Sequence, residues 1–237
     1  MSLLTICQNA ANEVGITAPS SLIGSTDQTA IRIYRAAVRT GSILSKKPWD
    51  RLVKRYNFNT VIGEPQYTLP SDYRSYVPGT LWNDTTDQEV FPASARRWTF
   101  EKVFPTSNYF DRARLLGNDS TTPTALGNSL TLHPTPTAVE NIVFEYYSRN
   151  WVTNAAGDTE QDAFATDTDL TVFDEDLFEL GVIWRLLKTL GQPYLEEKTE
   201  FDVQLEISLA QDGLAKSLHT DGNLPTLSNI PETGFGT

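Results

Sequence analysis

The stretch TVIGEPQYTLPSDYRSY, residues 60–76, decides how the chain is interpreted, because strand-like sequence begins here and no catalytic signature accompanies it. β-branched and aromatic residues punctuated by glycine and proline are typical of strands joined by turns. We expect Tyr67 and Leu69 to pack a sheet. Pro70 and Asp72 are expected to turn the chain, with the Asp72 carboxylate accepting hydrogen bonds from backbone N–H groups.

The same strand-and-turn composition extends from residue 56 to about residue 150. Leu130 and Leu132 alternate onto one face of a strand, and Ile142, Phe144 and Tyr146 do the same in a later one. The best strand candidates are YNFNTV (56–61), SYVPGTLW (75–82), RARLLG (112–117), SLTLHP (129–134) and NIVFEYYSRNW (141–151). This pattern predicts an antiparallel sheet or a small sandwich.

Helical periodicity precedes this region. Residues 2–15 carry apolar groups at the helical period and end at Gly15. A second helix is predicted from a Ser25 cap, with Gln28 as its capping-box partner, to about residue 46. Both helices therefore lie before the first strand.

Helical periodicity returns after a polar segment, residues 151–170, which we interpret as a loop. One helix is predicted over residues 173–190 and another over residues 193–217. The apolar stripe of the first consists of Leu177, Leu180, Gly181, Ile183, Trp184 and Leu187. The exposed side of the second holds Glu196, Glu197, Glu200, Asp202 and Glu206.

The order of these patterns predicts an α+β fold: a four-helix bundle with an inserted antiparallel β domain and an extended C-terminal arm. The divisions we expect are helices over 1–55, the β domain over 56–150, a loop and two helices over 151–217, and the arm over 218–237. The arm lacks periodicity, so it is either ordered by a partner or a frayed terminus.

Charge is distributed unevenly along the 237 residues. The net charge is −11, but residues 1–150 contribute +2 and residues 151–237 contribute −13. An acidic chain is poorly suited to gripping nucleic acid by neutralising phosphates. The acidic side chains either only support solubility, or they line a path along which DNA moves without binding.

Residues able to carry chemistry are few. The single cysteine, Cys7, falls on the apolar side of the first helix, where core packing is expected, and it excludes an intrachain disulfide. His133 and His219 do not form a metal-ligand spacing with it. The carboxylate pairs are too abundant to single one out. The segment DTDLTVFDED (167–176) lacks the glycine at the sixth position and the glutamate at the twelfth that an EF-hand loop needs. We therefore expect no catalysis, no metal and no cofactor, and no apolar run reaches the roughly 20 residues of a membrane span.

A basic helix face is the most informative charged feature. Arg32, Arg35 and Arg39 share one face of the second helix at spacings of three and four residues. This face is either a surface that meets an acidic partner, such as the acidic helices of a neighbouring copy, or an ordinary solvated face. A head-to-tail ring requires two complementary patches on one chain.

Several motifs together resemble the phage head-to-tail adaptor family of the tail tubular protein A type. They are WDRL at 49–52, FNTVIGEPQYTLPSDY at 58–73, GNSLTLHPTPT at 127–137, IVFEYY at 142–147 and LFELGVIWRLLKTLGQPY at 177–194. The resemblance spans about residues 2–215. It rests on the order and spacing of packing residues, because no motif here is a catalytic fingerprint.

The resemblance implies a non-enzymatic structural protein of the virion neck or tail, made in the host cytoplasm. The implied assembly is a ring of twelve copies beneath the portal, which joins the portal to the tail nozzle or tail tube and leaves a lumen for DNA. The C-terminal arm would order on docking to the portal, with Leu224, Leu227, Ile230 and Phe235 as its anchors. DNA would pass without specific binding, and no membrane is involved.

Two other classes of virion protein remain as alternatives at this point. A receptor-binding or baseplate protein is usually a β-rich trimer, and the long helical ends argue against it. A cell-wall-degrading enzyme requires a catalytic pair of residues in a cleft, and the sequence does not single one out.

Overall fold

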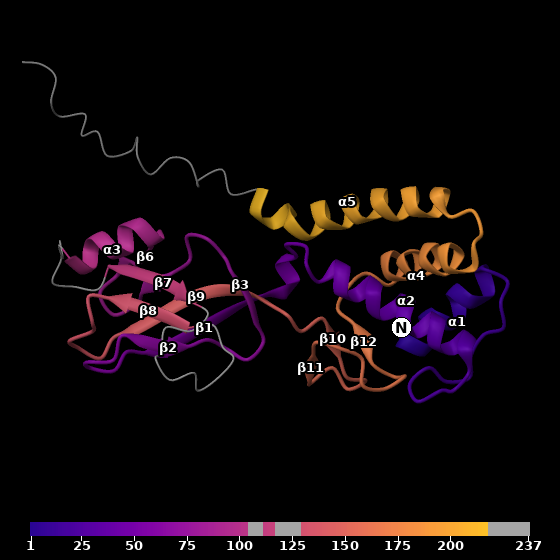
Figure 1. The fold of residues 1–237 in the computed structure, drawn as a ribbon, viewed down its shortest axis with the longest axis horizontal. Coiled ribbons are helices and arrows are strands. Elements are labelled where there is room, and N and C mark those ends of the chain that lie inside the picture. The colour runs from indigo at the N-terminus through magenta and orange to yellow at the C-terminus, as the bar shows by residue number, and fades with distance from the viewer. Residues whose placement is uncertain (104–110, 117–128, 218–237) are drawn as a thin grey trace, which may run out of the picture. The chain divides into compact units, whose positions relative to one another are not determined.

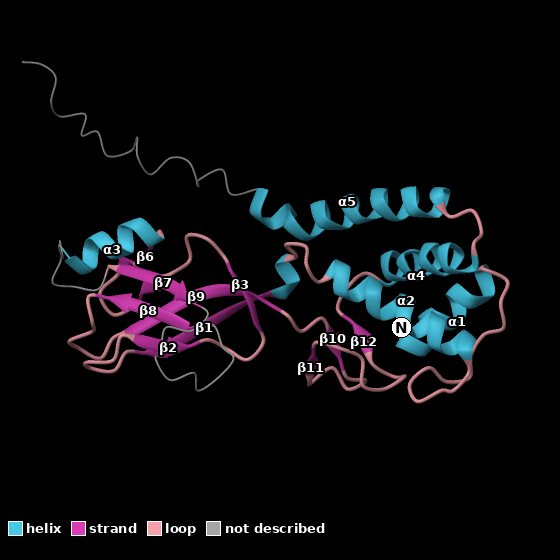
Figure 2. Ribbon diagram, viewed as in Figure 1, coloured by secondary structure: helices cyan, strands magenta, loops and turns pink. Residues whose placement is uncertain are grey.

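The computed structural model describes residues 1–103, 111–116 and 129–217. The chain forms two compact units, one built from residues 1–51 and from residue 152 onward, the other from residues 52–151. Figure 1 traces the chain through both units, and Figure 2 shows that helices dominate the first and strands the second. The mixed α+β class expected from the sequence is confirmed.

Four helices form the first unit: α1 (Leu3–Glu13), α2 (Gln28–Leu44), α4 (Glu175–Leu190) and α5 (Leu195–Ser217). Ser2 caps α1 and Asp174 caps α4, each accepting a backbone N–H of the first turn. The predicted Ser25 cap of the second helix is wrong. Asp27 caps α2 through the Ala30 N–H at 3.1 Å, while Ser25 accepts the Asp27 N–H.

Helix α4 is the centre of this unit, because it packs against α1, α2 and α5. Its buried residues lie on more than one side: the predicted Leu177, Gly181, Ile183 and Leu187 are buried, and so is Arg185. Leu180 and Trp184 are half-buried. The four-helix bundle stays a prediction, and the arm over 218–237 lies outside the described residues.

Gly181 lies where three helices pack closely together. A methyl group added at this position would lie 2.4 Å from Cγ2 of Thr40 on α2 and 3.0 Å from the Phe201 ring on α5. Distances below 3.0 Å require a neighbour to move, and Thr40 is fully buried. Only glycine therefore allows α2 and α5 to pack this closely against α4.

The predicted loop over residues 151–170 is wrong, because a small sheet occupies it. Strands β10 (Val152–Thr153), β11 (Glu160–Gln161) and β12 (Leu170–Thr171) pair antiparallel in the order β11-β10-β12. Two-residue strands leave no alternating pattern in the sequence. Leu3 N–H donates to the Asp169 carbonyl at 2.8 Å, so this segment also holds the start of α1.

The second unit contains two sheets. A short 3-10 helix (Asp50–Leu52) precedes β1. The first sheet has the order β1-β9-β4-β5, with β3 also paired to β9, and the second has the order β2-β8-β7-β6. Their bounds are β1 Val53–Asn59, β2 Gln66–Thr68, β3 Tyr73–Tyr76, β4 Trp82–Asn83, β5 Gln88–Glu89, β6 Phe91–Pro92, β7 Arg112–Leu116, β8 Ser129–His133 and β9 Asn141–Ser148. All pairs are antiparallel except β6 with β7, which is parallel.

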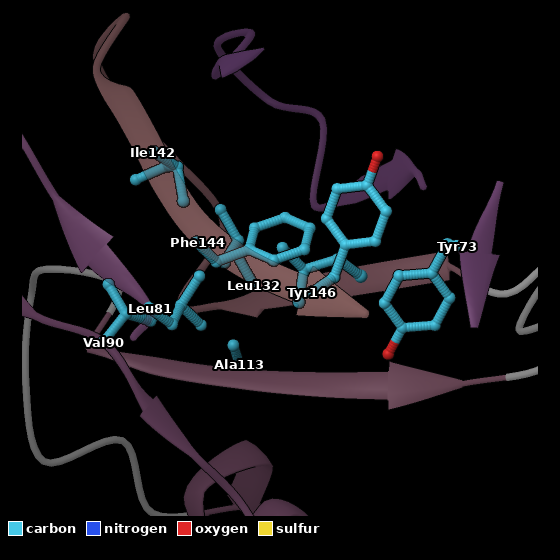
Figure 3. Close-up of a cluster of buried hydrophobic side chains, with 9 residues drawn as sticks. Tyr73, Leu81, Val90, Ala113, Leu132, Ile142, Phe144 and Tyr146 are labelled. Atoms are coloured by element: carbon cyan, nitrogen blue, oxygen red, sulfur yellow. The ribbon is translucent and has the colours of Figure 1, made fainter. Parts of the chain in front are cut away.

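One core joins the two sheets. The predicted inward residues of β8 and β9 are buried in it, among them Leu132, Ile142 and Phe144, which are at most 1% exposed. Figure 3 shows Ala113 of β7 facing this cluster and the Tyr73 and Tyr146 rings close together at one end. Tyr67 and Leu69 pack against it as expected. The unit is therefore a small sandwich.

Helix α3 (Ala95–Val103) was not predicted, because this segment reads as part of a strand-rich region. Ser94 accepts the Arg97 N–H at its start. Trp98 packs edge-on against His133 of β8, and the Glu101 carbonyl lies 3.1 Å from the His133 ring nitrogen. Packing against β8, rather than an apolar stripe in the sequence, explains why this helix forms.

Asp72 ties the turn of the opening stretch to the sheet, though not as predicted. Its carboxylate accepts hydrogen bonds from three side chains, Lys54 (2.9 Å), Tyr146 (2.8 Å) and Ser148 (2.8 Å), rather than from backbone N–H groups. Burial on its own would raise the pKa of Asp72, but the bonds from Lys54, Ser148 and Tyr146 outweigh it and the pKa is lowered. The ionised form is therefore part of the folded state.

Gly181→Ala is expected to reduce the free energy of unfolding by about 1–3 kcal/mol, because the added methyl overpacks the three-helix contact. This loss would occur even though alanine favours a helix by about 1 kcal/mol over glycine. Urea denaturation followed by circular dichroism measures it. The control is Gly213→Ala on α5, where nothing lies within 4 Å of the added methyl. Equal stability of the two variants would contradict the close approach.

Asp72→Asn is expected to destabilise the protein by about 1–3 kcal/mol at pH 7, since charged hydrogen bonds to Lys54, Tyr146 and Ser148 are weakened. A lowered folded-state pKa contributes stability above the ordinary value of 3.8, and that stability is lost as the pH falls through the folded-state pKa. The gap between wild type and variant should therefore close in acid. Exposed Asp84→Asn serves as the control, and a gap independent of pH would rule out this role.

Candidate interaction surfaces

The basic face of α2 consists of Arg32, Arg35 and Arg39, and all three side chains are exposed. The opposite face of the helix is buried, including Ile33, Ala37 and Leu44. Because α2 packs its apolar side on α4, the three guanidinium groups are directed to solvent on one side. The structure brings these predicted residues together as one surface.

These charges are not neutralised within the part of the chain that the structure describes. Arg32, Arg35 and Arg39 form no ion pair there. Other cations of the neighbouring sequence are engaged: Arg51 bonds the Asp212 carboxylate at 2.7 Å, and Lys54 bonds Asp72. The basic face of α2 is therefore left with its full positive charge.

Arg185 adds a buried positive charge behind this face. Its Nη1 donates to the Gly181 carbonyl at 2.6 Å and to Thr40 Oγ1 at 3.2 Å, and its guanidinium carbon lies 4.1 Å from the centre of the Trp184 ring. Burial, and secondarily the nearby Arg39 charge, lower the pKa of Arg185 to about 10, against the opposite pull of Asp202. The guanidinium remains charged at neutral pH.

The acidic face of α5 consists of Glu196, Glu200, Asp202 and Glu206, which are exposed as predicted, whereas Glu197 is half-buried. The helix rests on α4 through its other side, where Phe201 and Leu205 are buried. Asp202 shares its charge with Lys198 at 2.6 Å, one turn earlier. Within the part of the chain that the structure describes, Glu196, Glu200 and Glu206 form no ion pair.

Both faces also expose aliphatic side chains. On α5, Val203 (53% exposed) and Ile207 (44%) lie on the same side as Glu196 and Glu200, at helical spacing. On α2, Ile43 (43%) follows the three arginines on their side. Each face therefore combines charged and aliphatic side chains. Exposed aliphatic residues beside charge are typical of protein contacts.

The four predicted arm anchors, Leu224, Leu227, Ile230 and Phe235, lie outside the described residues.

Carboxylates that resemble a metal loop serve the backbone instead. Asp167 accepts the Leu22 and Ile23 N–H groups, at 3.0 and 2.9 Å. Asp169 accepts the N–H groups of Ala165 and Thr166. Burial on its own would raise the pKa of Asp169, and the Thr166 and Ala165 bonds outweigh it, so its pKa is lowered. Among the described residues, no group of three or more histidine, cysteine or acidic side chains is placed to hold a metal.

Cys7 is buried in the helical core, as predicted. Burial raises the pKa of its thiol, and the Asp167 and Glu179 charges raise it further. A neutral buried thiol is a poor nucleophile. Within the described residues, no helix combines the length and apolarity needed to cross a bilayer.

Comparison with protein families decides what kind of protein these surfaces belong to. The family model described as SU10 adaptor protein matches residues 1–224, nearly the whole chain. The chain belongs to this family of phage head-to-tail adaptors. The resemblance expected from the packing motifs is thereby confirmed. Comparison with curated proteins gives no significant match.

Family membership identifies this adaptor as a phage structural protein of the virion neck. Sequence reasoning found the charges of its two faces and missed their aliphatic residues, Ile43, Val203 and Ile207. The signal was present, because each falls on the charged side of its helix rather than on the buried stripe. Arg185 gave no such signal, since a charged residue in an apolar stripe does not reveal whether it is buried.

Proposed function

We propose that this chain is the subunit of a head-to-tail adaptor ring. In this ring, the basic face of α2 of one copy contacts the acidic face of α5 of the next. The ring, of twelve copies, joins the portal to the tail nozzle or tail tube and encloses part of the DNA channel. The observation that carries the proposal is that two complementary faces are exposed on one unit of one chain. A contact between unlike patches generates a ring when the rotation closes.

The two faces match in their order as well as in their charge. Eleven positions separate Arg32 from Ile43 on α2, and eleven separate Glu196 from Ile207 on α5. Aligned in parallel, Arg32 and Arg35 face Glu196 and Glu200 at one end, Arg39 faces Val203, and Ile43 faces Ile207 at the other end. Such a contact combines electrostatic orientation with apolar burial. This match supports a contact between the α2 face of one copy and the α5 face of the next.

The distribution of charge suits passage of DNA without binding. Residues 151–237 carry a net charge of −13, and a like-charged wall repels the phosphate backbone. The proposed role is structural, with no turnover. The burial of Cys7 and the use of Asp167 and Asp169 as backbone acceptors support that reading.

A charge swap tests the ring contact. The variant Arg32→Glu, Arg35→Glu, Arg39→Glu makes both faces negative, and the variant Glu196→Lys, Glu200→Lys, Glu206→Lys makes both positive. Each alone is expected to stay monomeric, because like charges meet at every contact. Their equimolar mixture is expected to assemble in alternation. Native mass spectrometry measures the oligomers, and circular dichroism confirms that each variant is folded.

The matched control for the charge swap is the corresponding change to glutamine, which removes charge without reversing it. It should weaken assembly less than reversal does and should gain nothing from mixing. If the Arg→Glu variant alone formed normal rings, the proposed contact would be wrong and the basic face would be an ordinary solvated surface.

Docking of the C-terminal arm to the portal is tested by truncation. Deletion of residues 219–237 is expected to leave a folded protein that no longer binds portal rings in a pull-down, since the sequence of the arm offers few apolar groups for a core of its own. Replacing Leu224, Leu227, Ile230 and Phe235 by serine should have the same effect. Replacing Asn223 and Asn229 by serine is the control, and portal binding by the truncated protein would refute the docking role.

A further inference from the structure

The first residue of α5 is an exposed leucine that precedes an unpaired carboxylate. Leu195 is 70% exposed, more than any other large hydrophobic side chain among the described residues. Glu196 is exposed and forms no ion pair in that part of the chain. A single exposed leucine is ordinary on protein surfaces, so its role depends on whether a matching surface exists.

A pocket of about 320 Å³ lies in the same helical unit, and we call it the helical pocket. Its lining includes Ile16 of the turn after α1, Thr29, Arg32 and Ile33 of α2, and Leu186 and Leu190 of α4. Among the described residues that line the pocket, Arg32 alone is charged, and Leu190 is 36% exposed. A cavity of about 150 Å³ accepts a benzene ring, so the helical pocket has room for a leucine side chain.

Helices α2 and α5 run in the same direction, because each packs antiparallel on α4. Thr40, near the end of α2, lies at Gly181 in the first half of α4. Thr29, at the start of α2, lines the pocket with Leu190 at the end of α4. Figure 1 shows α5 folding back along α4 after a short turn. The starts of α2 and α5 are therefore both at the end of the unit where α4 terminates.

The two helices also lie at nearly the same level. Thr40 and Phe201, which are 161 positions apart, both meet Gly181. The charge pattern of the two faces pairs Arg32 with Glu196, which are 164 positions apart. The difference of three positions is about 4.5 Å, less than one helical turn. A ring whose axis follows these helices keeps direction and level between copies, so it presents α5 of one copy to α2 of the next in the register that the charges favour.

The register also determines where the leucine side chain is directed. Successive residues lie about 100° apart around a helix axis. Leu195 precedes Glu196 and is displaced from it in one sense, whereas Ile33 follows Arg32 and is displaced from it in the other sense. In two parallel helices that face each other, opposite senses of rotation lead to the same side of the contact. Leu195 of one copy is therefore directed toward the side of α2 that lines the helical pocket.

Charge matches at the edge of the pocket. Arg32 lines the pocket and forms no ion pair among the described residues. Insertion of Leu195 brings the adjacent Glu196 carboxylate to this guanidinium. An apolar anchor in a pocket, with an ion pair at its rim, supplies both apolar burial and orientation in a protein interface.

We infer that Leu195 of one copy inserts into the helical pocket of the next copy of this chain. The inference rests on the proposed function, because it deepens the contact proposed there between α2 and α5. It gives that contact an apolar anchor at the end where Arg32 meets Glu196. Each copy gives its leucine to one neighbour and its pocket to the other, as a head-to-tail contact requires.

Disulfide trapping tests the insertion directly. The variants Leu195→Cys and Thr29→Cys are mixed under mild oxidation at assembly concentrations and run on a non-reducing gel. A disulfide forms only when the two Cα atoms come within about 7 Å, and the native Cys7 is buried and does not compete. The expected result is a cross-linked dimer from the mixture and not from either variant alone. A chain that carries both substitutions should give a ladder of higher multimers.

The matched control mixes Leu195→Cys with Ser42→Cys. Ser42 is half-buried on α2, as Thr29 is, but lies about 20 Å further along the helix. The pair with Thr29→Cys should give at least tenfold more cross-linked dimer than this control. Equal cross-linking of the two pairs would overturn the inference.

A second variant leaves the pocket unchanged. Leu195→Asp, at an exposed position, places a carboxylate where the pocket requires an apolar group, and it should reduce the fraction of assembled protein at least tenfold. Leu195→Met keeps an apolar side chain and should assemble as wild type does. Native mass spectrometry measures the oligomers, and circular dichroism confirms that both variants are folded.

The outcomes separate this inference from the proposed function. If the α2 charge reversal blocks assembly while Leu195→Asp assembles normally, the contact between α2 and α5 stands and only the leucine insertion is wrong. If wild type remains monomeric even with portal rings, the proposed function fails and the insertion fails with it.

Discussion

The close approach of three helices at Gly181 is the constraint on which the first unit depends. Without a side chain at this position, Thr40 of α2 and Phe201 of α5 both reach the backbone of α4. Arg185, one turn later, donates hydrogen bonds to the Gly181 carbonyl and to Thr40, and its guanidinium lies over the Trp184 ring. This buried cation therefore stabilises the same contact between helices. A cation held by carbonyl, hydroxyl and aromatic groups is stabilised without a carboxylate partner.

This packing determines which sides of α2 and α5 remain free. Because both helices place their apolar sides on α4, the arginines of α2 and the glutamates of α5 are directed to solvent, each followed by exposed aliphatic residues. The packing of the core therefore decides which side chains these two candidate surfaces expose. The β unit follows a similar logic, since Asp72 and Thr60 fix its turns and leave aliphatic side chains outside. In both units, polar bonds fix the elements that carry exposed apolar side chains.

The sequence predicted features that leave a long periodic pattern. Four helices, the inward residues of β8 and β9 and the three exposed arginines follow from periodicity alone. Features that depend on tertiary contacts were missed: α3 forms because Trp98 packs on β8, and β10–β12 are too short to alternate. Ser25 and Asp27 are both good capping residues two positions apart, and only the geometry selects Asp27. The burial of Arg185 depends on neighbours from three helices, which no local pattern contains.

Electron cryo-microscopy of the tagged chain, recovered with its partners from infected-cell lysate, tests the central claim most directly. The account predicts a twelve-fold ring bound to portal and nozzle proteins, in which α2 of each copy faces α5 of the next. A monomer, a three-fold particle, or a ring in which Arg32, Arg35 and Arg39 face solvent would contradict it.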